Sequence, residues 1–245
     1  VLGTVITHSG KLEGEIVLDL LAEHQSTAQF ICTKLLTTFV SDTPTLSALT
    51  ECKNSFLKHV NQEDQIALVL ESIFKSTSFS ASLNTLNKVK TPLEFLVALY
   101  RQLPINVSYR KTNTYLSGMG MPLFYYPLPT GWPEISINLV DSNQLIQRWN
   151  ITNDTLFGNP SQWRSYITDP TDFLINEGIE TTDGVLGFLF ELTLSHNYTE
   201  TEWIAAHSVL TNQQTEQFDI YAPDAEFKIR NLIALMLQYP AYQLQ

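Results

Sequence analysis

The sequence predicts an all-α fold, a multi-helix bundle interrupted by one long loop rich in proline and aromatic residues. Apolar residues recur at helical spacing along most of the 245 residues. No alternating pattern of useful length occurs, although residues 134–140 could form one short strand. The chain is 44% hydrophobic, so it can bury a sizeable core. We therefore expect a single helical domain over residues 1–245, with a weak boundary between two lobes near residue 160.

The first part of the chain is predicted to form a helical bundle. Apolar residues at helical spacing predict helices over residues 12–24, 26–40 and 45–60. The turn around Pro44 is short, so the second and third helices should pack antiparallel. A fourth helix should open at residues 61–64 and bury one face, made of Ile66, Val69, Leu70, Ile73 and Phe74.

Capping signals mark the later helices. Thr91-Pro92-Leu93-Glu94 is a capping box with proline at the first helical position, and it predicts a helix to Leu103. Asp141 should cap a helix through Leu156, ended by Gly158 and Pro160, with one face made of Leu145, Ile146 and Trp149. Further helices are predicted at residues 169–178, from residue 183, and from residues 223–224, the last being apolar almost all round.

Residues 119–133 form the segment that departs most from helical patterning. It contains four prolines and four aromatic residues, a composition that argues against disorder. Long irregular loops in compact domains are usually functional or disordered. Rigid amphipathic rings recognise sugars or protein partners, so the candidate binding residues are Phe124, Tyr125, Tyr126 and Trp132, with Arg148 adding a charge-assisted contact. The alternative is a plug packed over the helices, with Arg148 donating hydrogen bonds to loop carbonyls.

Cys32 and Cys52 lie at similar distances from the predicted turn around residues 41–44, which places them at one level of an antiparallel helix pair. A disulfide is possible there if both side chains face the seam, and it would indicate an oxidising compartment. The alternative is two small buried hydrophobic side chains.

Charge and composition exclude several classes of function. The formal net charge of -11 repels phosphate backbones, so we expect no nucleic-acid binding. No apolar run reaches about 18 residues, so no transmembrane segment is predicted in this sequence. The chain begins at Val1 without a charged-then-apolar leader, so any targeting segment is expected to be removed or to lie outside this sequence.

No catalytic residues are predicted. The nucleophile elbow is absent, and His8-Ser9-Gly10 is only a weak approximation to a triad. No histidine pair has metal-ligand spacing among His8, His24, His59, His196 and His207, so we expect neither a metal nor a cofactor. Carboxylate pairs such as Glu13/Glu15 and Glu177/Glu180 are expected to be solvated surface groups.

Four segments together resemble the bacterial domain-of-unknown-function 1800 family: residues 24–35, residues 88–95, Gly120-Met121-Pro122-Leu123-Phe124 through Gly131-Trp132-Pro133, and residues 235–243. The likeness covers most of the chain and corresponds to the C-terminal portion of the family. Gln25 stands where His-Pro is usual, and a tryptophan often found after Gly-Trp-Pro is replaced within residues 134–139. The resemblance implies an exported bacterial protein, periplasmic or extracellular, often encoded beside a phosphatase- or sulfatase-like protein.

The expected function is therefore binding of a protein partner or an extracellular polymer through the aromatic loop. One alternative is a hydrolase of extracellular polysaccharide, with two carboxylates converging beside Trp132. Another is a structural subunit of a surface assembly, in which the loop is buried against a neighbouring subunit.

Overall fold

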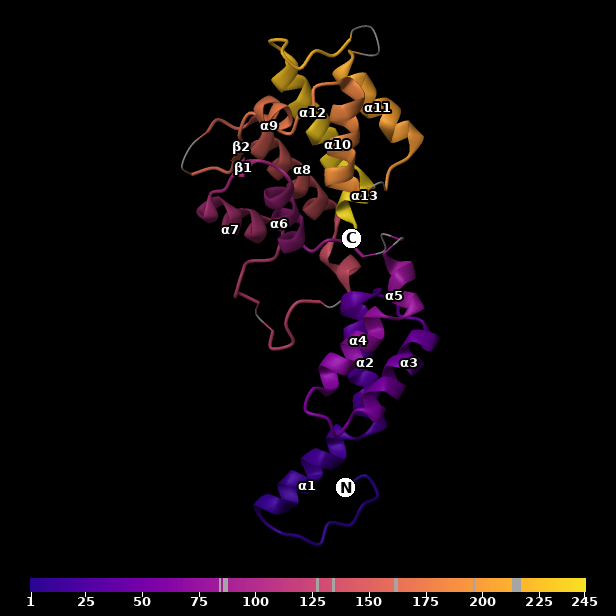
Figure 1. The fold of residues 1–245 in the computed structure, drawn as a ribbon. Coiled ribbons are helices and arrows are strands. Elements are labelled where there is room, and N and C mark those ends of the chain that lie inside the picture. Colours follow the sequence, from indigo (N-terminus) through magenta and orange to yellow (C-terminus); the bar gives the residue numbers. More distant parts are fainter. Residues whose placement is uncertain are drawn as a thin grey trace. The chain divides into compact units, whose positions relative to one another are not determined.

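The computed structural model describes residues 1–83, 85, 88–126, 128–133, 135–160, 163–195, 197–212 and 217–245. The described residues form helices α1 to α13, one 3-10 helix and two very short strands, so the predicted all-α fold is confirmed (Figure 1). The chain divides into two compact units, Val1–Asn87 and Lys88–Gln245. None of the described helices is both long and apolar enough to cross a membrane.

The described residues of the first unit form the helices α1 Lys11–Ala22, α2 Gln25–Phe39, α3 Leu46–Lys58, α4 Gln65–Phe74 and α5 Thr77–Ser82. Side-chain caps fix several of their starts, because the first amides of a helix have no partner within it. Thr45 Oγ1 accepts from the Ala48 amide at the start of α3. Ser76 Oγ accepts from the Phe79 amide at the start of α5.

The core of the first unit lies between α2, α3 and α4. Its buried side chains are Ala28, Cys32, Leu36, Val40, Ala48, Cys52, Phe56, Val69 and Ile73. On α4 the buried face is narrower than predicted, because Ile66 and Phe74 are exposed. Phe74 instead lies edge-on to Phe39, with ring centroids 5.3 Å apart.

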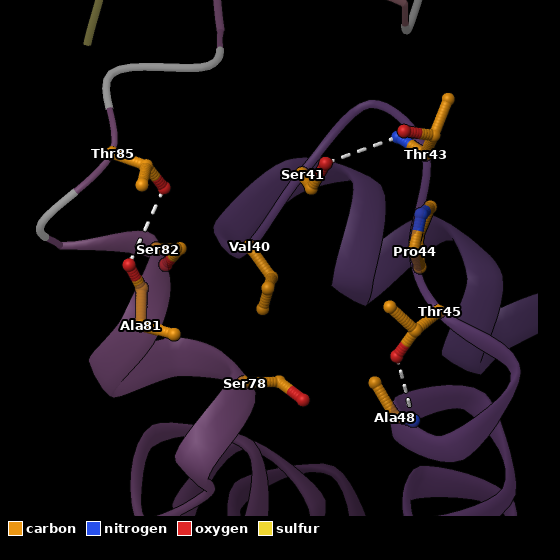
Figure 2. A pocket seen from close by; sticks show the side chains of 10 residues that line it. All are labelled: Val40, Ser41, Thr43, Pro44, Thr45, Ala48, Ser78, Ala81, Ser82 and Thr85. Carbon is orange, nitrogen blue, oxygen red and sulfur yellow. Dashed lines mark hydrogen bonds between the residues drawn. The ribbon is translucent and has the colours of Figure 1, made fainter.

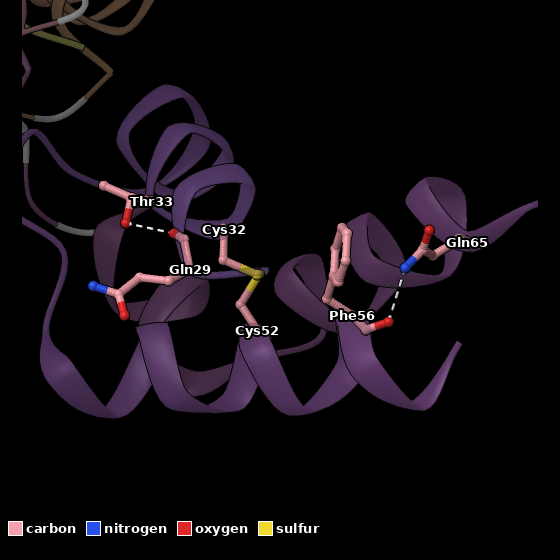
Figure 3. The surroundings of a disulfide bond; sticks show 6 residues. All are labelled: Gln29, Cys32, Thr33, Cys52, Phe56 and Gln65. Carbon is pink, nitrogen blue, oxygen red and sulfur yellow. Dashed lines mark hydrogen bonds between the residues drawn. A yellow bond between two sulfur atoms is a disulfide. The ribbon is translucent and has the colours of Figure 1, made fainter. Parts of the chain in front are cut away.

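The predicted disulfide is confirmed. Figure 3 shows the bond between Cys32 on α2 and Cys52 on α3. Their Cα atoms lie 5.7 Å apart. Both residues are buried, so the bond lies inside the core of the first unit. The alternative of two unbonded thiols is wrong.

The second unit contains the remaining elements. They are α6 Pro92–Gln102, β1 Ile105–Asn106, α7 Tyr109–Gly118, the 3-10 helix η1 Ser136–Leu139, α8 Ser142–Phe157, β2 Tyr166–Ile167, α9 Pro170–Asn176, α10 Thr182–Leu194, α11 Glu200–Leu210, α12 Ala225–Gln238 and α13 Pro240–Gln243. The strands pair antiparallel, with Ile105 opposite Ile167 and Asn106 opposite Tyr166. The predicted capping box is present, since Thr91 and Glu94 exchange hydrogen bonds at the start of α6.

Helix α12 organises the core of this unit, because it contacts α8, α9, α10, α11 and α13. The sequence predicts this burial from a helix that is apolar almost all round, and seven of its residues are buried.

The weak lobe boundary expected near residue 160 lies inside this unit. Helix α8, before residue 160, and strand β2, after it, contact each other. The structure divides the chain between residues 87 and 88 instead.

Two local expectations differ from the structure. The short strand expected over residues 134–140 is the 3-10 helix η1, and Glu134 lies outside the described residues. Helix α8 begins at the predicted Asp141 cap and ends at Gly158, but its buried face is not the predicted one. Ile146 and Trp149 are exposed, whereas the buried residues are Arg148, Ile151, Thr152, Thr155 and Leu156.

Candidate binding surface

The aromatic loop leaves α7 through a well-defined helix end. Met119 is fully buried, and Gly120 has a φ of +79°, a conformation that glycine adopts without strain. The Met121 amide donates to Leu116 O at 2.8 Å, and the Gly120 amide donates to Ser117 O at 3.0 Å. This pair of bonds is a Schellman motif, which satisfies the last carbonyls of the helix. The first residues of the loop are therefore held on the body of the second unit.

Phe124 lies in a tight turn that follows this anchor. The Tyr125 amide donates to Pro122 O at 3.4 Å, which places Leu123 and Phe124 at the centre of the turn. Phe124 has a φ of +58°, where glycine or asparagine is normally favoured and a side chain with a Cβ is strained. Its side chain is nevertheless fully exposed to solvent. The turn thus presents a large apolar ring to solvent at a cost in local backbone energy.

The neighbouring residues extend this exposed apolar surface. Tyr125 is 79% exposed, and Leu123 and Leu128 are also exposed. Residues 119–133 contain no Asp, Glu, Lys, Arg or His, so the loop itself is electrically neutral. Such a surface offers apolar contact and a tyrosine hydroxyl rather than ionic attraction. We refer to Leu123, Phe124, Tyr125 and Leu128 below as the loop tip.

Tyr126 and Trp132 form a pair of rings that closes the loop behind its tip. Their centroids are 4.4 Å apart with the planes tilted by 48°. Both side chains are half-buried, and Pro127 between them in sequence lies outside the described residues. Gly131, with a φ of +76°, donates its amide to Leu128 O at 3.3 Å and turns the chain towards Trp132. The ring pair therefore holds the two sides of the loop together at residues 126 and 132 and is less exposed than the tip.

Arg148 does not belong to this surface, which corrects the sequence-based expectation. Its side chain is 0% exposed, and its guanidinium donates from Nη1 to Gln243 Oε1 at 3.0 Å and from Nη2 to Lys90 O at 2.6 Å. The guanidinium also lies 5.1 Å from the ring centroid of Phe95. The one backbone carbonyl to which it donates belongs to Lys90 rather than to the loop. The plug alternative, in which Arg148 donates hydrogen bonds to loop carbonyls, is therefore also wrong about this residue.

Lys90 accompanies Arg148 as a second cation in this buried cluster. Lys90 Nζ donates to Tyr242 O at 2.7 Å and lies 4.2 Å from the Tyr242 ring centroid. Burial, with a smaller effect of the nearby Arg148 charge, lowers the pKa of Lys90 to about 8. Burial likewise lowers the pKa of Arg148 to about 10. Lys90 and Gln243 have no sequence signal for this cluster, because their partners lie far away in the chain.

The remaining chemical candidates are not gathered into a site. Glu15 pairs with Lys11 on the exposed surface of α1, and Glu180 accepts a hydrogen bond that raises the pKa of Tyr221. His8 is exposed, and His196 lies outside the described residues. Within the described residues, no group of three His, Cys, Asp or Glu side chains is arranged to hold a metal ion.

A cavity of about 300 Å³ opens in the first unit beside the turn between α2 and α3 (Figure 2). Val40, Ala48 and Ser78 point towards its centre. Most of its hydroxyl groups already bond to the backbone: Ser41 accepts from the Thr43 amide, Ser82 donates to Phe79 O, and Thr85 donates to Ala81 O. The cavity therefore lacks the convergent polar groups that usually orient a small ligand.

The fold and the loop define an all-α protein with an exposed aromatic turn. The model of the family described as protein of unknown function DUF1800 matches residues 1–244, so the chain belongs to this family. The family resemblance noted from the sequence is thereby confirmed. Searches of curated proteins and of solved structures found no match.

Proposed function

We propose that this chain is a binding module that recognises a protein partner through the loop tip. The observation that carries the proposal is Phe124, an apolar ring that is fully exposed and held in a positive-φ turn. Burying a phenylalanine side chain is worth about 1.5–3 kcal/mol, and the chain forgoes this gain in isolation. A partner that covers the ring would recover it, as aromatic anchors do at the centre of interfaces.

The neutrality of the loop favours a protein surface over a charged ligand. Loop residues 119–133 carry no ionisable group other than tyrosine, so recognition there must rest on apolar area and hydrogen bonds. Interface cores are similarly depleted in charged residues and enriched in aromatic ones. Tyr125 adds a hydroxyl at the edge of the tip, where water can still reach it.

The hydrolase alternative receives less support from the surroundings of the loop. Asp141 is the first carboxylate of the described chain after the loop, and its Oδ1 accepts from the Gln144 amide at 2.8 Å as the cap of α8. A carboxylate that already caps a helix is a poor general acid or nucleophile. A glycosidase needs two catalytic carboxyl groups about 5 to 10 Å apart.

The proposed compartment is the periplasm or the exterior of a bacterial cell. The Cys32–Cys52 disulfide supports this location, because such bonds persist in oxidising compartments and are rare in the cytosol. The phosphatase- or sulfatase-like protein that the family resemblance implies as a neighbour in the genome is the first partner to test.

Photocrosslinking tests the proposal in the cells that produce the chain. A photoreactive phenylalanine analogue replaces Tyr125 in one variant and Leu46 in a second, since Leu46 is exposed on α3 in the other unit and serves as the control. The proposal predicts one discrete crosslinked protein from position 125 and none from position 46, identified by mass spectrometry. Equal crosslinking from both positions, or none from position 125, would contradict it. Crosslinking to a second copy of the chain would instead support the structural-subunit alternative.

A further inference from the structure

Charge is strongly segregated along the second unit. Residues 88–168 contain seven Lys and Arg against four Asp and Glu, whereas residues 169–245 contain two against twelve. The positive excess therefore lies in the first half of a unit that is acidic as a whole. Two of these seven cations, Lys90 and Arg148, belong to the buried cluster described above, so attraction of anions to this surface depends on the cations that are exposed.

One exposed cation lies over an exposed tryptophan, and two more cations are next to this pair in sequence. Arg110 lies in the first turn of α7, and its guanidinium carbon is 4.7 Å from the ring centroid of Trp163, just before β2. The Trp163 side chain is 53% exposed, and its neighbour Arg164 is exposed as well. Lys111 follows Arg110 on the same helix. We call Arg110, Lys111, Trp163 and Arg164 the basic platform.

The platform is held by buried contacts beneath it. The Ser108 amide donates to Ser165 Oγ at 3.0 Å, a buried bond that joins the start of α7 to the segment carrying Trp163. Ser165 Oγ in turn donates to the Tyr100 hydroxyl on α6 at 3.2 Å. These buried hydrogen bonds hold the backbone that carries the exposed groups, which lowers the entropic cost of binding.

One carboxylate partly balances the three cations. Asp154 on α8 pairs with Arg164 at 2.8 Å and with Lys111 at 3.7 Å, and it also accepts from the Tyr115 hydroxyl. Within the described part of the chain, Arg110 makes no ion pair and contacts the tryptophan ring instead. The platform thus keeps an excess of positive charge, and Arg110 is the cation best placed to receive an external anion.

We propose that the basic platform binds an anionic polysaccharide, with Trp163 stacking on a sugar ring and Arg110 bonding its carboxylate or sulfate. A guanidinium presents paired donors that match the two oxygens of such a group. The flat ring beside it suits the apolar face of a sugar, which an acidic peptide does not provide. The choice of a cell-envelope polymer rests on the proposed export of the chain, but the platform and the loop tip are separate surfaces with separate tests.

The experiment measures binding of the whole chain to immobilised polygalacturonate, with neutral dextran and poly-L-glutamate as comparison polymers. Arg110→Gln and Trp163→Ala test the platform. Lys58→Gln removes one positive charge from the exposed end of α3 in the other unit and is the control. The proposal predicts binding to polygalacturonate, weakened about tenfold by either platform substitution and unchanged by Lys58→Gln.

Binding should also weaken between 50 and 200 mM salt, since surface ionic contacts are screened. Arg110 is exposed, so Arg110→Gln keeps the test valid if Trp163→Ala fails to fold. Absence of binding to polygalacturonate would overturn the proposal. Equal loss in Arg110→Gln and Lys58→Gln, or equal binding of poly-L-glutamate, would also overturn it, because either result indicates attraction to charge without recognition of a sugar.

Discussion

Arg148 and Gln243 are joined by a buried hydrogen bond of 3.0 Å between Nη1 and Oε1, although they lie 95 positions apart. The Gln243 amide nitrogen also donates to Leu237 O at 2.9 Å, so the same side chain contacts α8 and the end of α12. On the other side, Arg148 holds the carbonyl of Lys90, and residues 88–90 exchange backbone hydrogen bonds with residues 243–245. Arg148 therefore fastens the two ends of the second unit together.

Replacing Arg148 should destabilise the second unit. Arg148→Met removes two charge-assisted hydrogen bonds and leaves the buried Gln243 oxygen without its donor, so we expect a loss of roughly 2–4 kcal/mol in the free energy of unfolding. Arg148→Lys should not restore it, because one ammonium cannot reproduce the planar fork. Chemical denaturation measures both. If the Arg148→Met protein is as stable as the wild type but no longer binds its partner, Arg148 is a binding residue and this account of it is wrong.

The stability of the second unit should depend on pH through Lys90. The unfolded chain keeps the Lys90 proton up to its ordinary pKa of 10.5, whereas the folded chain releases it near pH 8. The unfolded state therefore binds more protons in this window, and this group makes the free energy of unfolding rise as pH increases from about 8 to 10. Denaturation at several pH values should show this rise in the wild type and lose it in Lys90→Met. A fall in stability over the same window in the wild type only would contradict the assignment.

The disulfide should contribute strongly to the first unit. Cys32 and Cys52 are separated by 20 positions, and closing a loop of that length in the unfolded chain is worth about 3 kcal/mol. Reduction should therefore lower the midpoint of thermal unfolding of the wild type. A Cys32→Ala/Cys52→Ala variant should start lower and show no response to reductant. If the wild-type midpoint of thermal unfolding stays unchanged after the disulfide has been fully reduced, the bond does not contribute this stability.

Features whose signal is local can be predicted from the sequence. The Thr91–Glu94 capping box and the Asp141 cap depend on residues three positions apart, and both form as predicted. The Cys32–Cys52 pairing depends on one short turn between two helices, so similar offsets from that turn place the two residues at one level, although they leave a bond and two buried thiols both open. The irregular segment at residues 119–133 is predictable because its prolines and aromatic residues interrupt helical spacing.

The rest depends on contacts between distant segments. Arg148 occupies a helix position that charge alone assigns to solvent, and its acceptors come from Lys90 and Gln243. Helix α7 is not predicted by apolar periodicity, because it is poor in apolar residues and buries Tyr115 and Leu116 alone. The positive φ of Phe124 has no sequence signal, since glycine would be expected at that turn position.

Trp132 should act on binding indirectly. Its ring lies 4.4 Å from that of Tyr126 and is half-buried, so Trp132→Ala removes this contact within the loop and little exposed area. Without this contact the loop is less ordered before it binds, and ordering it on binding costs conformational entropy. We therefore expect crosslinking from position 125 to fall several-fold. Trp132→Phe keeps a ring next to Tyr126 and should retain most of the crosslinking. Full crosslinking in Trp132→Ala would show that the ring pair does not support the tip.

The central claim is that the exposed ring of Phe124 serves binding rather than folding. Phe124→Gly removes the ring and relieves the strain of a Cβ at positive φ, an effect of about 1 kcal/mol that the extra freedom of glycine in the unfolded chain partly offsets. The most direct measurement therefore follows one variant by two readouts, denaturation and photocrosslinking from position 125. The account predicts unchanged or slightly higher stability together with loss of the crosslinked partner. Clear destabilisation with the crosslink retained would contradict it, because the ring would then serve the fold.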